Sequence, residues 1–110
     1  MALRQLTKGE ETLLSFLVSR STIKIAPDWK ANLLVSPMDD GGMGSLLLFP
    51  EGKQRDHRQF GQTVAEYQFR DADGIDVLAS LNLDENGDLF EMDIWKTTFD
   101  PLLEFPTHLQ

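Results

Sequence analysis

The chain contains no cysteine among its 110 residues. Disulfide bonds, thiol catalysis and cysteine-based zinc sites are therefore excluded, and a reducing compartment is the natural environment. No apolar run is long enough to span a membrane. Residues 1–7 also lack the apolar run and small-residue cleavage site of a signal peptide. These absences predict a soluble, cytoplasmic protein that does not enter membranes.

Basic side chains are scarce in the last third of the chain. Residues 71–110 hold ten acidic side chains and one basic one, Lys96, whereas residues 1–70 hold eight acids and nine bases. The two parts therefore carry −9 and +1, which sum to the net charge of −8. Because phosphate contacts need clustered Lys and Arg, nucleic acid is not an expected partner. The acidity suits a basic protein partner, or it simply keeps a small domain soluble.

Histidine is also scarce, and His57 and His108 do not combine with a nucleophile and an acid into a catalytic set. The acidic turn at residues 84–88 does not match a calcium loop, because Leu89 and Trp95 stand where an EF-hand needs Gly and Glu. The glycine-rich segment 39–44 precedes a predicted strand, whereas a phosphate-binding loop precedes a helix. We therefore expect no enzyme activity, cofactor or metal. Acid–base or metal chemistry at paired carboxylates is a less favoured alternative.

The sequence predicts one N-terminal helix. Thr7 and Glu10 have the spacing of a capping box, in which each side chain binds the other's backbone N–H. An apolar stripe at helical spacing follows, and it predicts a helix from about Lys8 to Arg20 that contains Leu13, Leu14, Leu17 and Val18. A short second helical turn is predicted near Pro27.

The hydrophobic period then changes from helical to two, which is typical of strands. Strands are predicted at about residues 32–38, 45–49, 62–71, 75–83 and 89–98. The polar segment 51–61 is predicted to be a mobile or functional loop. We therefore predict that residues 1–110 form a single α+β domain, with the N-terminal helix packed on one face of an antiparallel sheet of about five strands.

The pair Asn86-Gly87 is typical of a two-residue type I′ hairpin turn, because both positions need positive φ. That turn places apolar residues opposite one another on one face: Leu83 and Phe90, Leu81 and Met92, Ala79 and Ile94. The other face receives Asn82 opposite Glu91, Ser80 opposite Asp93, and Leu78 opposite Trp95. A one-residue slip would mix the two faces, so the register is well specified.

A three-residue loop at 72–74, with Gly74 left-handed, best suits the preceding hairpin. It sets Phe69 opposite Val77, and Arg70 opposite Asp76 as an opposite-charge pair. The inner face of the sheet then carries Tyr67, Phe69, Val77, Ala79, Leu81, Leu83, Phe90, Met92 and Ile94. The outer face carries Glu66, Gln68, Arg70, Ser80, Asn82, Glu91, Asp93 and Trp95.

Trp95 is the most informative residue of the predicted outer face. A Trp on a polar face needs a cover, which is either the C-terminal segment 99–105 or a partner. A Trp with a polar rim is typical of the centre of a protein interface. The candidate partner-binding residues are therefore Trp95, Asp93, Glu91, Arg70, Glu66 and Asn82.

Three segments, Leu3–Glu11, Asp40–Ser45 and Asn82–Lys96, resemble a family of small uncharacterised bacterial proteins. The most specific part is the run Asp-Ile-Trp-Lys at residues 93–96, before Phe99 and Pro101-Leu102. In size, acidity and helix-plus-sheet plan, the chain is more generally similar to immunity proteins of bacterial toxin systems. That similarity implies a protein that binds and neutralises a basic toxin domain.

Two other interpretations stay open. The first is a small ligand-binding domain or enzyme, with a site lined by Glu91, Asp93, Arg70 and the 39–44 loop. The second is a homodimer formed through the sheet face or an edge strand.

Overall fold

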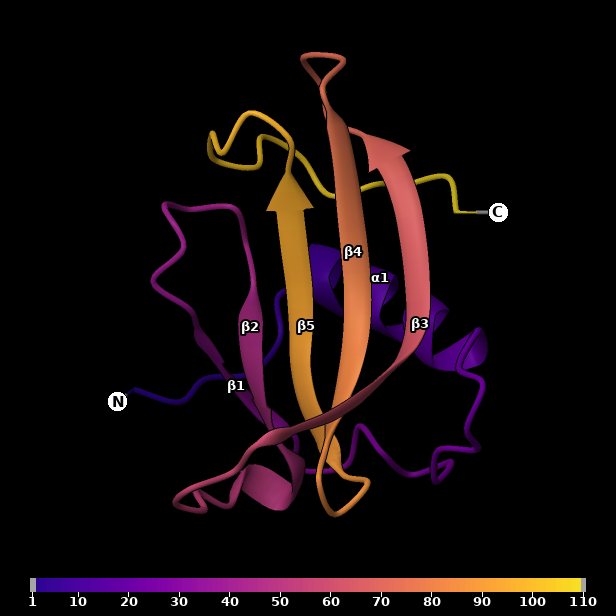
Figure 1. Cartoon of the computed structure of the whole chain (residues 1–110), viewed down its shortest axis with the longest axis vertical. Coiled ribbons are helices and arrows are strands. Elements are labelled where there is room, and N and C mark those ends of the chain that lie inside the picture. The colour runs from indigo at the N-terminus through magenta and orange to yellow at the C-terminus, as the bar shows by residue number, and fades with distance from the viewer. Residues whose placement is uncertain (1, 110) are drawn as a thin grey trace.

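In a computed structural model, which describes residues 2–109, one helix packs on a five-stranded antiparallel sheet (Figure 1). The strand order is β1-β2-β5-β4-β3. The elements are α1 Lys8–Ser19, β1 Leu34–Pro37, β2 Leu46–Phe49, the 3₁₀ helix η1 Pro50–Gly52, β3 Phe60–Arg70, β4 Asp76–Asp84 and β5 Leu89–Lys96. The predicted α+β fold is therefore confirmed. Within the described residues, no helix is long and apolar enough to cross a membrane.

Helix α1 begins with the predicted capping box. The Thr7 N–H donates to Glu10 Oε1 at 2.8 Å, and the Glu10 N–H donates to Thr7 Oγ1 at 3.3 Å. The apolar stripe of α1 faces the sheet, and Leu13, Leu14 and Leu17 are fully buried there. Near Pro27 the chain forms single hydrogen-bonded turns and no helix.

The β3–β4 hairpin has the predicted three-residue loop. The Asp71 N–H donates to the Ile75 carbonyl at 2.9 Å, and Gly74 is left-handed with a φ of 82°. Phe69 pairs with Val77, and Arg70 with Asp76, as predicted. Charge pairing and apolar sorting were therefore sufficient to fix this register.

The predicted two-residue turn of the β4–β5 hairpin is wrong. Gly87 has positive φ but Asn86 does not, and the Asp84 N–H donates to the Asp88 carbonyl at 2.9 Å around a three-residue loop. The physical reason is the Asp84 side chain, whose Oδ1 accepts the N–H groups of Asn86 at 2.9 Å and Asp88 at 3.0 Å. Such side-chain-to-backbone bonds favour a turn anchored on Asp84.

This longer loop shifts the end of the ladder by one residue. Leu83 pairs with Leu89, so Leu89 takes the buried place predicted for Phe90, which is only half-buried. The shift is absorbed between Asn82 and Leu83. The remaining predicted pairs are confirmed, from Asn82–Glu91 to Leu78–Trp95.

The C-terminal segment runs behind the sheet, on the side of α1 (Figure 1). Leu102, Phe105 and Leu109 pack against the core, and the Phe105 ring lies against Gly9 of α1. The inner face is therefore covered by both the helix and the tail.

Candidate protein-binding face

Within residues 2–109, neither α1 nor the tail covers the outer face of the sheet, because both lie behind the strands (Figure 1). Glu66, Gln68 and Arg70 of β3 are exposed on this face. On the two central strands, Ser80 and Glu91 are half-buried and Asn82 is buried, whereas Asp93 and Trp95 are exposed. Strand pairing brings the central members of this set together across β4 and β5. We call this surface the outer face.

Trp95 points outward because its neighbours Ile94 and Lys96 point inward, where both are buried. It remains 43% exposed, opposite half-buried Leu78. The Phe99 ring meets the Trp95 ring edge-on at a centroid distance of 6.3 Å and is itself 66% exposed. Leu102 and Phe105 turn to the inner side, and the described contact of the tail with Trp95 is the Phe99 ring. The two rings form an exposed aromatic pair at one end of β5.

Neutral side chains donate hydrogen bonds to the carboxylates of Asp93 and Glu91. The Ser45 hydroxyl donates to Asp93 Oδ1 at 3.2 Å and accepts the Ile94 N–H at 2.8 Å. Glu91 Oε1 accepts from Asn82 Nδ2 at 3.3 Å, and Asn82 Oδ1 accepts from the Thr63 hydroxyl at 2.8 Å. Asn82 therefore positions Glu91 and offers little surface of its own.

The charge of the outer face is largely uncompensated. Arg70 pairs with Asp76 at 3.4 Å, but both side chains are well exposed, so this pair contributes little stability. Within residues 2–109, Glu66, Glu91 and Asp93 form no ion pair. Negative charge is therefore available around Trp95.

Lys96 is fully buried at the end of β5, a feature that the sequence interpretation missed. Its Nζ donates to Asp71 at 2.8 Å, to Asp73 at 2.7 Å and to the Pro101 carbonyl at 3.2 Å. Two features of the sequence could have predicted its burial. Period-two alternation places Lys96 on the inner face with Met92 and Ile94, and Lys96 is the one Lys or Arg side chain among the ten acids of residues 71–110.

Hydrogen bonding sets the protonation of this buried group. Hydrogen bonds to Asp71 and then to Asp73 raise the pKa of Lys96. Burial by itself would raise the pKa of Asp71, but hydrogen bonds from Lys96 and from three backbone N–H groups outweigh it and lower that pKa. Lys96 therefore offsets one of the two negative charges of Asp71 and Asp73 inside the fold.

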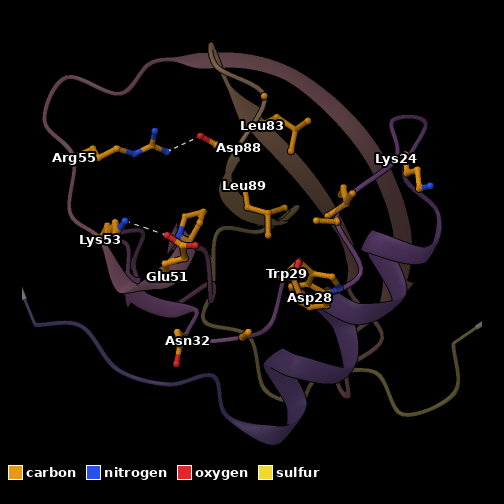
Figure 2. A pocket seen from close by; sticks show the side chains of 15 residues that line it. Lys24, Asp28, Trp29, Asn32, Glu51, Lys53, Arg55, Leu83, Asp88 and Leu89 are labelled. Carbon is orange, nitrogen blue, oxygen red and sulfur yellow. Dashed lines mark hydrogen bonds and ion pairs between the residues drawn. The ribbon is translucent and has the colours of Figure 1, made fainter.

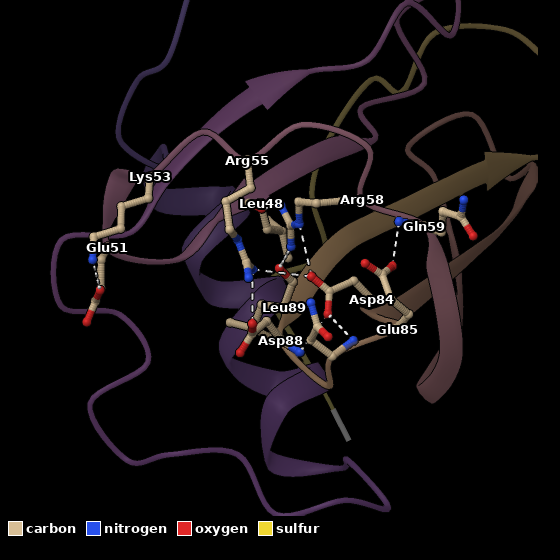
Figure 3. Close-up of polar contacts among 11 residues, drawn as sticks. Leu48, Glu51, Lys53, Arg55, Arg58, Gln59, Asp84, Glu85, Asp88 and Leu89 are labelled. Atoms are coloured by element: carbon tan, nitrogen blue, oxygen red, sulfur yellow. Dashed lines mark hydrogen bonds and ion pairs between the residues drawn. The ribbon is translucent and has the colours of Figure 1, made fainter.

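A second ionic cluster closes the opposite end of the sheet (Figure 3). Arg58 donates to Asp84 at 3.0 Å, to the Leu48 carbonyl at 2.6 Å and to the Leu89 carbonyl. Arg55 adds bonds to Asp84 at 3.3 Å and to the exposed carboxylate of Asp88 at 2.9 Å. These bonds connect the polar loop 51–61, which was predicted to be mobile or functional, to β2, β4 and β5. Arg55 and Arg58 therefore have a structural role.

The largest hollow described, of ≈ 650 Å³, is shown in Figure 2, and no residue of the outer face lines it. Its apolar floor includes Trp29, Leu83 and Leu89, and its charged lining consists of Lys24, Asp28, Glu51, Lys53, Arg55 and Asp88. Four of these charges pair with one another, Lys53 with Glu51 at 3.2 Å and Arg55 with Asp88 at 2.9 Å.

The expected lining of a ligand site was Glu91, Asp93, Arg70 and the 39–44 loop. Of these, only Arg70 lines any of the three hollows described, and it lies apart from the others, beside Tyr67 and Phe105. Within residues 2–109, no three His, Asp or Glu side chains are grouped so that they could hold a metal ion. The carboxylates beside Trp95 therefore stand on an open surface.

The fold and this face define a class: an α+β domain with one covered and one open, acidic sheet face. Residues 3–106 match a family model described as a domain of unknown function, DUF6984, and the chain belongs to that family. Searches of curated proteins and of solved structures found no match.

Proposed function

We propose that this chain is a cytoplasmic, non-enzymatic binding domain whose outer face takes a basic protein partner, in the manner of an immunity protein that neutralises a toxin domain. The observation that carries the proposal is the exposure of Trp95 two residues from Asp93, on a face where Glu66, Glu91 and Asp93 form no ion pair within residues 2–109. Tryptophan with a polar rim is enriched among residues that dominate binding energy.

The chemistry of the face suits Arg or Lys side chains of the partner. Asp93 and Trp95 are two residues apart on β5 and share one face, at a separation of about 7 Å. A guanidinium group stacked on the Trp95 ring would therefore lie close enough to Asp93 for an ion pair. Glu91 and Glu66 extend the negative field and would steer the approach of a basic surface.

Isothermal titration calorimetry with basic protein domains encoded beside the gene tests this proposal. Trp95→Ala should weaken binding by about 30-fold, which corresponds to a hot spot of about 2 kcal/mol. Reversal of both Glu91 and Asp93 to Lys should weaken it further and reduce its salt dependence.

The matched control is Glu11→Lys with Asp28→Lys. It changes the net charge by the same amount at two exposed positions away from the outer face. Binding by this control should stay close to that of the parent protein. Retained affinity after the Trp95, Glu91 and Asp93 changes together would reject the outer face as the binding surface.

A further inference from the structure

We infer that the free edge of β3 pairs with β3 of a second copy, in an antiparallel register centred on Gln68. This interface adjoins the proposed partner site. It uses the backbone edge of the sheet and shares Glu66 and Arg70 with the outer face, whereas Trp95, Glu91 and Asp93 lie outside it. The two edges of the sheet differ in how far the chain covers them.

The β1 edge is covered by the chain itself. The Arg4 N–H donates to the Val35 carbonyl at 2.9 Å, and the Val35 N–H donates to the Arg4 carbonyl at 2.7 Å. The β3 edge has one described bond of this kind, from the Thr22 N–H to the Val64 carbonyl at 2.8 Å. Register shifts before Ala65 also interrupt the first half of β3. Added backbone bonds and register shifts of this kind prevent a strand edge from pairing with another chain. On β3, the ones described here do not extend beyond Val64.

From Ala65 to Arg70 the pairing of β3 with β4 is regular. The bond from the Asp71 N–H to the Ile75 carbonyl marks a hydrogen-bonded pair, so antiparallel alternation turns the Phe69 and Tyr67 backbone groups toward β4. The N–H and C=O groups of Glu66, Gln68 and Arg70 therefore point to the free edge. Within residues 2–109, none of these six groups has a described partner at that edge.

The side chains of this segment are complementary to a second copy. In the register centred on Gln68, Glu66 of each copy stands opposite Arg70 of the other, and Gln68 stands opposite itself. Opposite-charge pairs across neighbouring strands are stabilising, and like charges are destabilising. A register centred on Glu66 or on Arg70 would oppose like charges. The Gln68 register also sets Tyr67 opposite Phe69 on the inner face, and it makes about six backbone hydrogen bonds.

The partner is therefore a second copy of this chain, related by a two-fold axis at Gln68. The two sheets join into one, and Arg70 lies between its own Asp76, 3.4 Å away, and Glu66 of the other copy. The sequence Glu66-Tyr67-Gln68-Phe69-Arg70 thus carries opposite charges at its ends and aromatic rings at its inner positions.

Charge reversal tests the register in solution. By sedimentation equilibrium, the parent protein should reach twice its monomer mass of 12.5 kDa as concentration rises. Arg70→Glu alone and Glu66→Arg alone should each raise the dimer dissociation constant at least about tenfold, because each opposes like charges. An equimolar mixture of the two variants should restore the dimer, because every cross-strand pair is again opposite in charge.

Cysteine cross-linking tests the position of the axis, without background because the chain has no cysteine. Opposed residues of a hydrogen-bonded pair have Cα atoms about 5.5 Å apart, which a disulfide can span. Gln68→Cys should therefore cross-link on mild oxidation. The control Glu66→Cys should not, because its two copies lie about 14 Å apart in this register.

Several results would overturn the inference. The first is that the parent protein stays monomeric at millimolar concentration. The second is that the mixture of the two charge variants fails to dimerise. The third is that Cys at position 66 and Cys at position 68 cross-link equally well. A dimer that is lost in Trp95→Ala but kept in Arg70→Glu would place the interface on the outer face instead. None of these results decides whether the outer face binds a basic partner.

Discussion

Lys96 Nζ lies 2.8 Å from Asp71 Oδ2, and both side chains are excluded from solvent. Asp71 also accepts the backbone N–H groups of Leu103 at 2.8 Å and Glu104 at 3.0 Å. One carboxylate thus joins the β3–β4 turn, the end of β5 and the tail. The last third of the chain neutralises part of its own acidity here, so the acids of the outer face are distinguished by having no such partner.

Removal of Asp71 should destabilise the fold strongly. Asp71→Ala leaves Lys96 buried without its main partner, and loss of one member of a buried ion pair costs about 3–5 kcal/mol. The measurement is the free energy of unfolding from urea titration. The control is Asp76→Ala, which removes an exposed pair and should cost no more than about 1 kcal/mol. Similar losses in the two variants would contradict this role for Asp71.

The free energy of unfolding should fall steeply as the pH is lowered. The pKa values of Asp71, Asp84 and Glu10 are all lowered in the folded protein, because hydrogen bonds and ion pairs outweigh their burial. The unfolded chain then binds more protons, so these groups contribute fully above their ordinary pKa values of about 4 and lose their contribution as pH falls through the lower folded values.

The pKa of Lys96 is raised, so its contribution is present below its ordinary pKa of about 10.4 and is lost only above it. Together these directions predict a stability plateau from about pH 5 to pH 10. Midpoints of thermal unfolding against pH should show it, and Asp71→Asn should flatten the acidic limb. If the midpoint of Asp71→Asn fell with acid as steeply as that of the parent protein, Asp71 would not be a source of the acidic limb.

Arg58 should not be replaceable by lysine. Its guanidinium bonds Asp84 and two main-chain carbonyls at once, which a single ammonium cannot reproduce. Arg58→Lys should therefore cost about 2 kcal/mol or more, because buried acceptors are left unsatisfied. Urea unfolding measures this loss. Arg55→Lys, at a more exposed position, should cost less than about 1 kcal/mol, and the reverse order would be incompatible with the geometry of the cluster.

Gly61 should tolerate no side chain. A Cβ atom there would overlap the Asp84 carbonyl oxygen, a backbone atom that cannot move aside without disturbing β4. Gly61→Ala should cost about 1–3 kcal/mol, as overpacking does. Gly74→Asn is the control, since its φ of 82° lies in the left-handed region that Asn accepts, and open space surrounds it. Thermal unfolding of both variants checks the difference; an unaffected Gly61→Ala protein would count against the close approach.

The sequence alone predicted the elements correctly where the local sequence pattern agrees with the overall fold. The capping box fixed the start of α1, and the opposite charges of Arg70 and Asp76 fixed the β3–β4 register. The β4–β5 turn failed because the Asp84 side chain competes with the preference of Asn86-Gly87. A register shift between Asn82 and Leu83 restored the predicted pairing from Asn82–Glu91 to Leu78–Trp95, so the predicted pairing of Trp95 with Leu78 was confirmed.

The ionic clusters could not be predicted in the same way. Arg58 meets Asp84 across 26 positions, and Lys96 meets Asp71 across 25. No local period encodes such contacts. The same limit applies to the tail, whose turn to the inner side leaves Trp95 exposed.

The most direct test of the proposed binding face is an amide NMR footprint of the ¹⁵N-labelled protein, titrated with a basic domain encoded beside the gene. The largest shifts should occur at residues 91–95, 78–82 and 63–70, and the Trp95 indole N–H should be among them. Shifts concentrated instead at residues 24–32 and 50–55, around the hollow that contains Trp29, would contradict the proposed binding face.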